Sequence, residues 1–205
     1  MRVIALANEK GGVGKTSACI NLACHVASQG ATSVIIDMDP QRSTMSWGKR
    51  RGDGSNPETV SAQVADLERT IKALRSSGVS WCFLDLPGRS APVTSAGLKA
   101  SHLILIPSRP FDMDLEGSKD VVAAAHRLKK QYAFLMNIAP PNSARSRDVA
   151  AQLRDAGHKV APVVIHQRVS VADAIAEGRG VCEHEPKGAA AAEFANLFTW
   201  IEDAL

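Results

Sequence analysis

The sequence predicts a three-layer α/β/α fold with a mostly parallel central sheet. Three observations lead to this expectation. Short apolar runs alternate with longer segments of helical periodicity, the runs are almost continuously apolar, and a glycine-rich loop connects the first run to the first helical segment. Strands buried on both faces have such continuous runs, and their alternation with helices is typical of parallel βαβ units.

Length and composition favour one compact domain. The chain has 205 residues, of which 45% are apolar and 22% are charged, and these are ordinary values for a globular domain. We therefore expect a single domain over residues 1–205. The net charge of +3 does not require a nucleic-acid partner, although a local basic face is compatible with it.

Cysteine spacing and hydropathy indicate a cytoplasmic protein. The four cysteines form no C-x-x-C pair: they are Cys19, Cys24, Cys82 and Cys182. Neither a zinc site nor a disulfide framework is indicated, and we expect buried thiols in a reducing cytosol. No stretch approaches the ~20 apolar residues that a membrane span requires.

Six apolar runs are predicted as strands. Each is short and nearly continuous in apolar residues, as expected for strands that helices cover on both sides. They lie at residues 2–7, 33–36, 81–84, 103–106, 133–136 and 160–165.

Helical periodicity is clear in three segments. Apolar residues at 64, 67, 71 and 74 share one face of a helix that is predicted to start near Ser61 and to stop at Gly78. Asp112 precedes a helix-compatible stretch that reaches Lys130. A C-terminal helix has an apolar face made of Phe194, Leu197, Phe198, Ile201 and Leu205. Residues 52–57 are predicted as a loop.

The strongest functional signal is the segment 10–16, KGGVGKT, which directly follows the first predicted strand. Glycines let successive backbone N–H groups point at phosphate oxygens, and the following helix adds the positive end of its dipole. The second lysine would reach the β- and γ-phosphates, and the threonine hydroxyl would ligate Mg²⁺. The predicted phosphate-binding residues are Lys10, Gly11, Gly12, Val13, Gly14, Lys15, Thr16 and Ser17.

This segment departs from the ordinary P-loop pattern, because Glu9 stands where that pattern has a glycine. A dinucleotide-binding fingerprint fits less well, since Ser17 stands at the position of its third glycine. A plain glycine-rich turn is the remaining alternative.

The additional lysine at the start of the loop resembles the variant phosphate-binding loop of the ParA/MinD family of P-loop ATPases. Two further segments resemble that family in the same order. Residues 37–41, DMDPQ, are similar to its switch I, and residues 83–88, FLDLPG, to its Walker B strand and switch II. The resemblance covers essentially the whole chain and is strongest to the small plasmid-type ParA partition proteins. It implies an enzyme that hydrolyses ATP with Mg²⁺ and forms an ATP-sandwich homodimer.

The resemblance implies catalytic roles for both lysines of the loop. In that family the additional lysine, here Lys10, crosses the dimer and touches the phosphates bound by the other subunit. A cation delivered by a second subunit makes hydrolysis depend on dimerisation, as an arginine finger in trans does. A solvated loop lysine is the alternative for Lys10, whereas Lys15 is expected to contact the phosphates of its own subunit.

Three residues are expected to surround the metal ion: Thr16, Asp39 and Asp85. The resemblance implies that Asp39 orients the attacking water and the Mg²⁺ shell, and Asp37 would support it. Asp85 would hold Mg²⁺ through a water, because Mg²⁺ keeps much of its hydration. Acidic residues that end apolar strands also occur as helix caps, and that alternative stays open for Asp39 and Asp85.

Two residues beyond the loop are predicted to lie near the nucleotide. The resemblance assigns the adenine contact to Asn137, which follows the fifth predicted strand, and it places Pro107 near the nucleotide and the dimer interface. The alternative for Pro107, and for Pro110 beside it, is that both simply end a strand.

The resemblance also implies non-specific DNA binding by the ATP-bound dimer. Basic residues would neutralise phosphates without reading bases, and the first candidates are Arg145, Arg147 and Arg168. Taken alone, each of them fits a solvated surface charge better than a DNA contact. The implied biology is partition or positioning of plasmid or chromosome cargo on the nucleoid, with a ParB-like or small centromere-binding DNA-binding partner.

Two related classes fit the sequence less well. A membrane-bound MinD-like protein needs a basic amphipathic tail, but residues 193–205 carry three acidic residues and no Lys or Arg. An iron–sulfur relative needs two cysteines beyond switch II, where only Cys182 follows. The alternative function that stays open is an ATP-dependent dimeric scaffold or regulator that positions a non-DNA cargo with little turnover.

Overall fold

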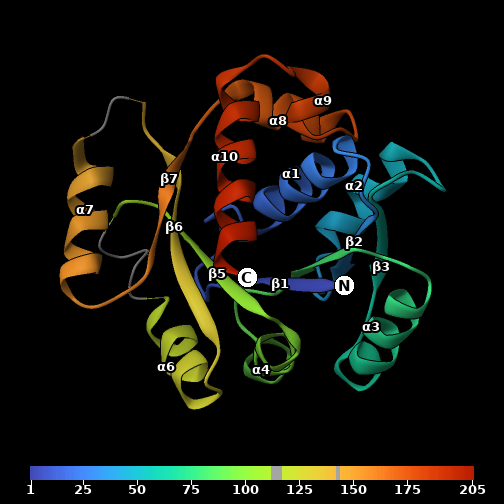
Figure 1. Ribbon diagram of the computed structural model, residues 1–205, viewed down its shortest axis with the longest axis horizontal. Coiled ribbons are helices and arrows are strands. Elements are labelled where there is room, and N and C mark those ends of the chain that lie inside the picture. Colours follow the sequence, from blue (N-terminus) through green and yellow to red (C-terminus); the bar gives the residue numbers. More distant parts are fainter. Residues whose placement is uncertain (112–116, 142–143) are drawn as a thin grey trace.

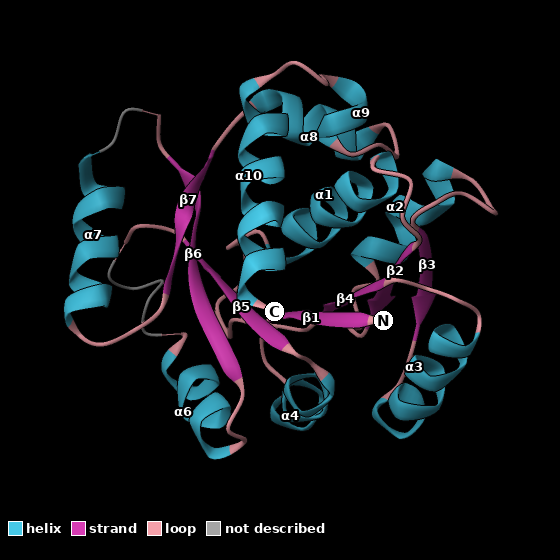
Figure 2. Cartoon of the chain, viewed as in Figure 1, coloured by secondary structure: helices cyan, strands magenta, loops and turns pink. Residues whose placement is uncertain are grey.

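The computed structural model describes residues 1–111, 117–141 and 144–205 and confirms the predicted three-layer architecture (Figure 1). A seven-stranded sheet, with strand order β3-β2-β4-β1-β5-β6-β7, runs through the centre, and every neighbouring pair in it is parallel. Helices cover both of its faces (Figure 2). Parallel strands need this cover, because their apolar side chains point to both faces.

The six predicted strands are present, and one further strand was missed. The strands are β1 (Arg2–Leu6), β2 (Ser33–Asp37), β3 (Glu58–Ser61), β4 (Trp81–Asp85), β5 (Leu103–Ser108), β6 (Gln131–Ala139) and β7 (Val160–His166). The missed strand, β3, is an edge strand with the sequence ETVS, and none of its residues is fully buried. An edge strand that faces water carries no continuous apolar run, so the criterion used for the other six could not find it.

The sheet separates two groups of helices, one on each of its faces (Figures 1 and 2). Each group packs against the sheet through its own apolar core. One core contains side chains of α1 (Lys15–Ser28), α2 (Ser43–Arg51), α8 (Val169–Ala176), α9 (Val181–His184) and α10 (Ala189–Ala204). The other contains side chains of α3 (Leu67–Ser76), α4 (Ala91–Ala100), α6 (Lys119–Arg127) and α7 (Ala144–Asp155).

Two details of the helix prediction were wrong, and a third concerns a residue outside the described part of the chain. Ser61 ends β3 instead of starting a helix, and α3 begins at Leu67 after the short 3₁₀ turn Val64–Asp66. Leu205 follows α10 and is 40% exposed, so it does not extend the apolar face. Asp112 lies outside the described residues. The predicted loop at 52–57 is confirmed, and Gly52 and Gly54 adopt positive φ there.

The cysteine prediction is confirmed for three of the four residues, which are buried, whereas Cys182 is half-buried; all four thiols are free. Among the described helices, none has both the length and the apolar character needed to cross a membrane.

The topology brings the predicted motifs to one edge of the sheet. In the parallel register, Asp85 at the end of β4 lies beside Leu6 at the end of β1 on one side and beside Asp37 at the end of β2 on the other. The phosphate-binding segment leaves β1 at this edge. Ligands of open α/β sheets bind beyond the carboxyl ends of the strands, so this edge is where a site is expected.

Candidate functional site

The loop between β1 and α1 has the geometry of an anion cradle. Gly12 and Gly14 adopt φ values of 74° and 84°, which L-residues with a side chain rarely reach. Gly11 and Gly12 face open space, because a Cβ on either would meet no heavy atom within 4 Å. Helix α1 begins at Lys15 without a side-chain cap, so its first backbone N–H groups remain available to an anion beside the loop.

Gly14 is required for a second reason besides its backbone conformation. A Cβ at this position would collide with the side-chain amide of Asn137, which donates to the carbonyl oxygens of Val13 at 2.8 Å and of Gly14 at 3.4 Å. Asn137 is almost fully buried. The structure therefore places Asn137 directly beneath the loop, where its amide nitrogen holds the loop backbone. Its contact with adenine stays a prediction.

Lys15 lies across the loop with its ammonium group inside. Its side chain is buried, and Nζ donates to the carbonyl oxygens of Asn8 at 3.0 Å and Lys10 at 3.2 Å. Burial lowers the pKa of Lys15, and the carboxylates of Asp85 and Asp39 oppose that shift. The positive charge is thus held between the loop and two acidic residues, which is the position from which it can meet phosphate oxygens.

Asn8 fixes the start of the loop, a role that the sequence analysis did not assign. It is 1% exposed, and its Nδ2 donates to the carbonyl oxygen of Pro107 at 2.9 Å and to Oγ of Ser108 at 3.2 Å. Its Oδ1 accepts from the backbone N–H of Lys10 at 2.9 Å. Pro107 therefore supports the loop through its carbonyl, within a strand that continues to Ser108. A polar residue directly after an apolar strand was the only signal of this role.

Two hydroxyl groups converge on one oxygen of Asp85. Oγ1 of Thr16 and Oγ1 of Thr44 each donate to Oδ2 of Asp85 at 2.7 Å. Asp85 is 1% exposed, and burial raises its pKa to about 6 even though both hydrogen bonds lower it. The helix-cap alternative for Asp85 is wrong, because its oxygen is engaged by side-chain hydroxyls and the next helix, α4, begins six residues later.

Switch I is organised by Asp37. Its Oδ1 accepts from the N–H of Asp39 and its Oδ2 from the N–H of Met45, both at 3.0 Å. Asp37 thereby satisfies a backbone donor in the first turn of α2 and orients Asp39, as expected from the sequence. Asp39 itself is half-buried, and its Oδ1 accepts from the N–H of Gln41 at 2.9 Å. The N-cap position of α2 is Arg42, which has no side-chain cap, so Asp37 holds the first turn from the end of β2, and Asp39 forms a tight turn before the helix.

The side-chain oxygens at the carboxyl ends of β2 and β4 are suitable ligands for a magnesium ion. Thr16 and Asp85 are already in contact, and Asp37 is the register neighbour of Asp85. Hydroxyl and carboxylate oxygens together with retained waters are the ligands that Mg²⁺ prefers. The open, glycine-lined loop beside them fits a polyphosphate, so the residues present fit ATP with Mg²⁺.

The three candidate DNA contacts differ in their surroundings. Arg145 and Arg147 lie exposed at the start of α7. The guanidinium group of Arg145 lies 5.4 Å from the centroid of the Phe111 ring, and its Nε donates to the carbonyl oxygen of Pro110. Arg168 instead forms an ion pair with Glu193 at 2.7 Å. A paired guanidinium is less available to a phosphate, so Arg168 is the weaker candidate.

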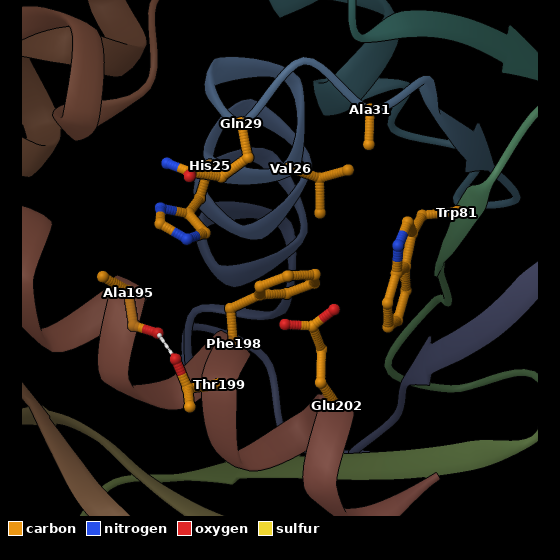
Figure 3. A pocket seen from close by; sticks show the side chains of 9 residues that line it. All are labelled: His25, Val26, Gln29, Ala31, Trp81, Ala195, Phe198, Thr199 and Glu202. Atoms are coloured by element: carbon orange, nitrogen blue, oxygen red, sulfur yellow. Dashed lines mark hydrogen bonds between the residues drawn. The ribbon is translucent and has the colours of Figure 1, made fainter.

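A pocket of about 540 Å³ lies elsewhere in the molecule (Figure 3). His25 and Gln29 line it from the end of α1, Trp81 from the start of β4, and Phe198 and Glu202 from α10. Lys15 and Asp85 stand at the opposite ends of α1 and β4. The pocket is therefore distinct from the phosphate-binding loop, and the acidic Glu202 makes it a poor place for a phosphate.

The raised pKa of Asp85 implies that the free energy of unfolding falls as the pH rises, in the absence of Mg²⁺ and nucleotide. Since its folded pKa of about 6 exceeds the ordinary value of 3.8, its contribution to stability is greatest below pH 4 and is lost as the pH rises through 6. Asp85→Asn stays neutral and can accept both hydroxyl protons. We expect this variant to be more stable than the wild type by on the order of 2–3 kcal/mol at pH 8.

Urea unfolding in EDTA between pH 4 and pH 8 tests this expectation. The advantage of the variant should shrink towards zero at pH 4. In the presence of ATP, added Mg²⁺ should stabilise the wild type further but not the variant. A difference between the two proteins that is the same at every pH would contradict the assignment of Asp85 as a buried carboxylate with a raised pKa.

Comparison with known proteins agrees with the geometry. Residues 4–181 match the model of the CobQ/CobB/MinD/ParA nucleotide binding domain. The chromosome-partitioning ATPase Soj of Thermus thermophilus is 30% identical over 96% of this chain and 94% of its own length. The maintenance of carboxysome distribution protein A of Halothiobacillus neapolitanus is 26% identical over 94% and 92%, respectively.

The fold recurs in solved structures. The septum site-determining protein MinD of Pyrococcus horikoshii, complexed with Mg-ADP, superposes with a TM-score of 0.75 at 17% identity and covers 99% of this chain and 96% of that one. The match of the family model to most of the chain, together with the order of the three motifs along the strand ends, shows that the chain is a member of the CobQ/CobB/MinD/ParA nucleotide-binding family, with a MinD/ParA-type P-loop fold.

Proposed function

We propose that the chain is a Mg²⁺-dependent ATPase that cycles between a monomer and an ATP-bound homodimer and, as the dimer, binds DNA without sequence preference. In this cycle it positions a cargo on the nucleoid together with a partner protein. The observation that carries the proposal is an open glycine-rich loop that holds the Lys15 ammonium, next to a Thr16 hydroxyl bonded to Asp85, with Asp85 and Asp39 acting electrostatically on Lys15.

The residues divide the chemistry between them. Lys15 and the first N–H groups of α1 bind the phosphates, and Thr16 and Asp85 hold the metal ion. A bound Mg²⁺ supplies positive charge at the phosphate oxygens. Asp39 orients the attacking water. Lys10, contributed by the second subunit, stabilises the charge that develops during transfer, which makes turnover depend on dimerisation.

DNA binding is assigned to the dimer because a single chain offers few phosphate contacts. With a net charge of +3, the monomer has no strong overall attraction for DNA, whereas a two-fold dimer presents each exposed arginine twice. Arg145 and Arg147 are the favoured contacts because both lie exposed at the start of α7, whereas Arg168 is half-buried beside Glu193. The partner is a ParB-like or small centromere-binding protein, by analogy with the partition relatives.

A second candidate function is a dimeric ATP-dependent regulator that positions a non-DNA cargo with little turnover. One relative favours a non-DNA cargo, because it is named for the maintenance of carboxysome distribution in Halothiobacillus neapolitanus. Both candidates use the same nucleotide site, and they differ in DNA binding and turnover.

Binding to two unrelated DNA duplexes tests the proposed function. With ATP and Mg²⁺ we expect similar affinity for both duplexes, weak binding with ADP, and a loss of roughly 10³-fold or more between about 50 and 200 mM salt if six or more phosphates are contacted. Arg147→Ala should weaken both duplexes equally and reduce the salt dependence. Equal binding with ADP and ATP, or strong preference for one duplex, would contradict the proposed DNA cycle, and no binding to either duplex would favour the second candidate.

A further inference from the structure

Thr44 makes a contact that neither the motifs nor the comparisons assign. It lies in the first turn of α2, three residues after switch I, and its side chain is fully buried. Its hydroxyl donates to the same Oδ2 of Asp85 that receives the hydroxyl of Thr16. A residue of the switch region is thereby bonded directly to the carboxylate that faces the expected metal position.

The contact restricts the carboxylate of Asp85. The terminal torsion of an aspartate is broad, so a single donor leaves the carboxylate considerable freedom to rotate. Two donors that approach one oxygen from different elements, α1 and α2, determine which oxygen faces Thr16 and how the carboxylate plane is turned. Since Mg²⁺ demands near-ideal octahedral geometry, the orientation of this carboxylate matters for its binding.

The contact also connects the first turn of α2 to the metal position. Asp37 holds that turn through the N–H of Met45, and Thr44 holds it through Asp85, which is the register neighbour of Asp37. The start of α2 thus forms hydrogen bonds with the last residues of two adjacent strands, Asp37 of β2 and Asp85 of β4. A change in the position of Asp85 alters one of these two attachments.

From these contacts we propose that Thr44 is a positioning residue for the magnesium site: its hydroxyl orients Asp85 and thereby couples occupation of that site to the first turn of α2. The inference rests on the proposed binding of ATP with Mg²⁺. Thr44 is fully buried and its hydroxyl is engaged by Asp85, so we expect its loss to weaken the effect of the metal and to spare the binding of metal-free ATP.

Helix α2 has enough other contacts to stay in place when this hydroxyl is removed. At its far end, Arg51 pairs with both carboxylate oxygens of Glu183 at 2.6 and 2.8 Å, and its Nη1 also donates to the carbonyl oxygen of Gly178. Nε1 of the fully buried Trp47 donates to the carbonyl oxygen of Arg179. A valine at position 44 keeps the volume and the β-branch of threonine and removes only the donor, so we expect Thr44→Val to fold.

The test compares Thr44→Val with Thr44→Ser, which keeps the hydroxyl. A fluorescent ATP analogue is titrated into each full-length protein in EDTA and then at increasing Mg²⁺. We expect all three proteins to bind the analogue with similar affinity in EDTA. Thr44→Val should need about tenfold more Mg²⁺ than the wild type for half of the metal-dependent gain, as the loss of one hydrogen bond to a charged group implies, and Thr44→Ser should stay within about twofold.

A measurement on the unmodified protein supports or overturns the same inference. Hydrogen exchange of the amides of residues 43–47 is compared with ATP in EDTA and with ATP and Mg²⁺. We expect the metal to slow exchange in this segment several-fold. Unchanged exchange would overturn the coupling to α2.

Two further outcomes separate this inference from the function on which it rests. If Thr44→Val responds to Mg²⁺ as the wild type does, or if Thr44→Ser is as defective as Thr44→Val, the positioning role is wrong while the proposed function stands. If the wild type binds the ATP analogue with no gain from Mg²⁺, the proposed function fails and the inference falls with it.

Discussion

Replacing Lys15 with alanine is expected to abolish ATP binding. The Lys15 ammonium is the buried positive charge that lies across the loop, and the carboxylates of Asp85 and Asp39 act on it electrostatically. Without it, the negative phosphates would meet these carboxylates with no compensating charge. Loss of charge-assisted contacts to two phosphates weakens binding by at least about a hundredfold. Titration with a fluorescent nucleotide measures the effect.

Lys10→Ala is the matched control in the same loop. The proposed contact of Lys10 is with the phosphates of the other subunit. The affinity of this variant for ATP should therefore stay within about an order of magnitude of the wild-type value, while hydrolysis that depends on dimerisation should be lost. Thermal unfolding of both variants should show a folded protein, since burial lowers the pKa of Lys15 and its charge is therefore costly to bury. If Lys15→Ala keeps its affinity within twofold, the assignment of the phosphate-binding loop is wrong.

Much of the fold could be predicted because its strands are buried on both faces. Strands β1, β2, β4 and β5 are almost entirely buried and have continuous apolar runs. Apolar pattern did not reveal the edge strand β3, which faces water, or the true start of α3. There, Val64 has helical spacing from Leu67 but lies in a 3₁₀ turn and is 43% exposed. Spacing alone does not distinguish these cases.

Candidate site residues could be selected from the sequence where they lie in one local motif, and their roles stay predictions. The loop, Asp39 and Asp85 belong to short segments with recognisable patterns. The roles of Asn8 and Thr44 could not be predicted from such patterns. Asn8 contacts Pro107, 99 positions away in the chain, and Thr44 contacts Asp85, 41 positions away. The ion pair of Arg168 with Glu193 could not be predicted for the same reason, since the two residues lie 25 positions apart. Such contacts depend on the three-dimensional packing of elements, which no single-sequence pattern records.

Asp39→Ala is expected to slow ATP hydrolysis strongly while leaving ATP binding intact. Its carboxylate lies close enough to Lys15 to affect the pKa of that residue, yet Asp39 does not hold the loop, which Asn8 and Asn137 support. Without the carboxylate, the attacking water loses the group that orients it. Steady-state phosphate release, measured in parallel for the wild type and the variant with and without DNA, should fall about a hundredfold or more.

Asp39→Asn separates charge from turn geometry. The asparagine oxygen can still accept the N–H of Gln41, as Oδ1 of Asp39 does at 2.9 Å. If the carboxylate acts in hydrolysis, Asp39→Asn should hydrolyse ATP as slowly as Asp39→Ala. If Asp39 serves only the turn, Asp39→Ala should lose about 1 kcal/mol of stability with turnover intact. In that case Asp39→Asn should match the wild type in both stability and turnover.

The proposed cycle requires that ATP joins two chains and that hydrolysis separates them. Sedimentation velocity of the wild type and Asp39→Ala with ATP and Mg²⁺ measures this directly. We predict that the wild type is dimeric only while ATP lasts and is monomeric with ADP, whereas Asp39→Ala stays dimeric for the whole run. Monomers of both proteins in the presence of ATP, with binding of the nucleotide confirmed in the same samples, would contradict the account.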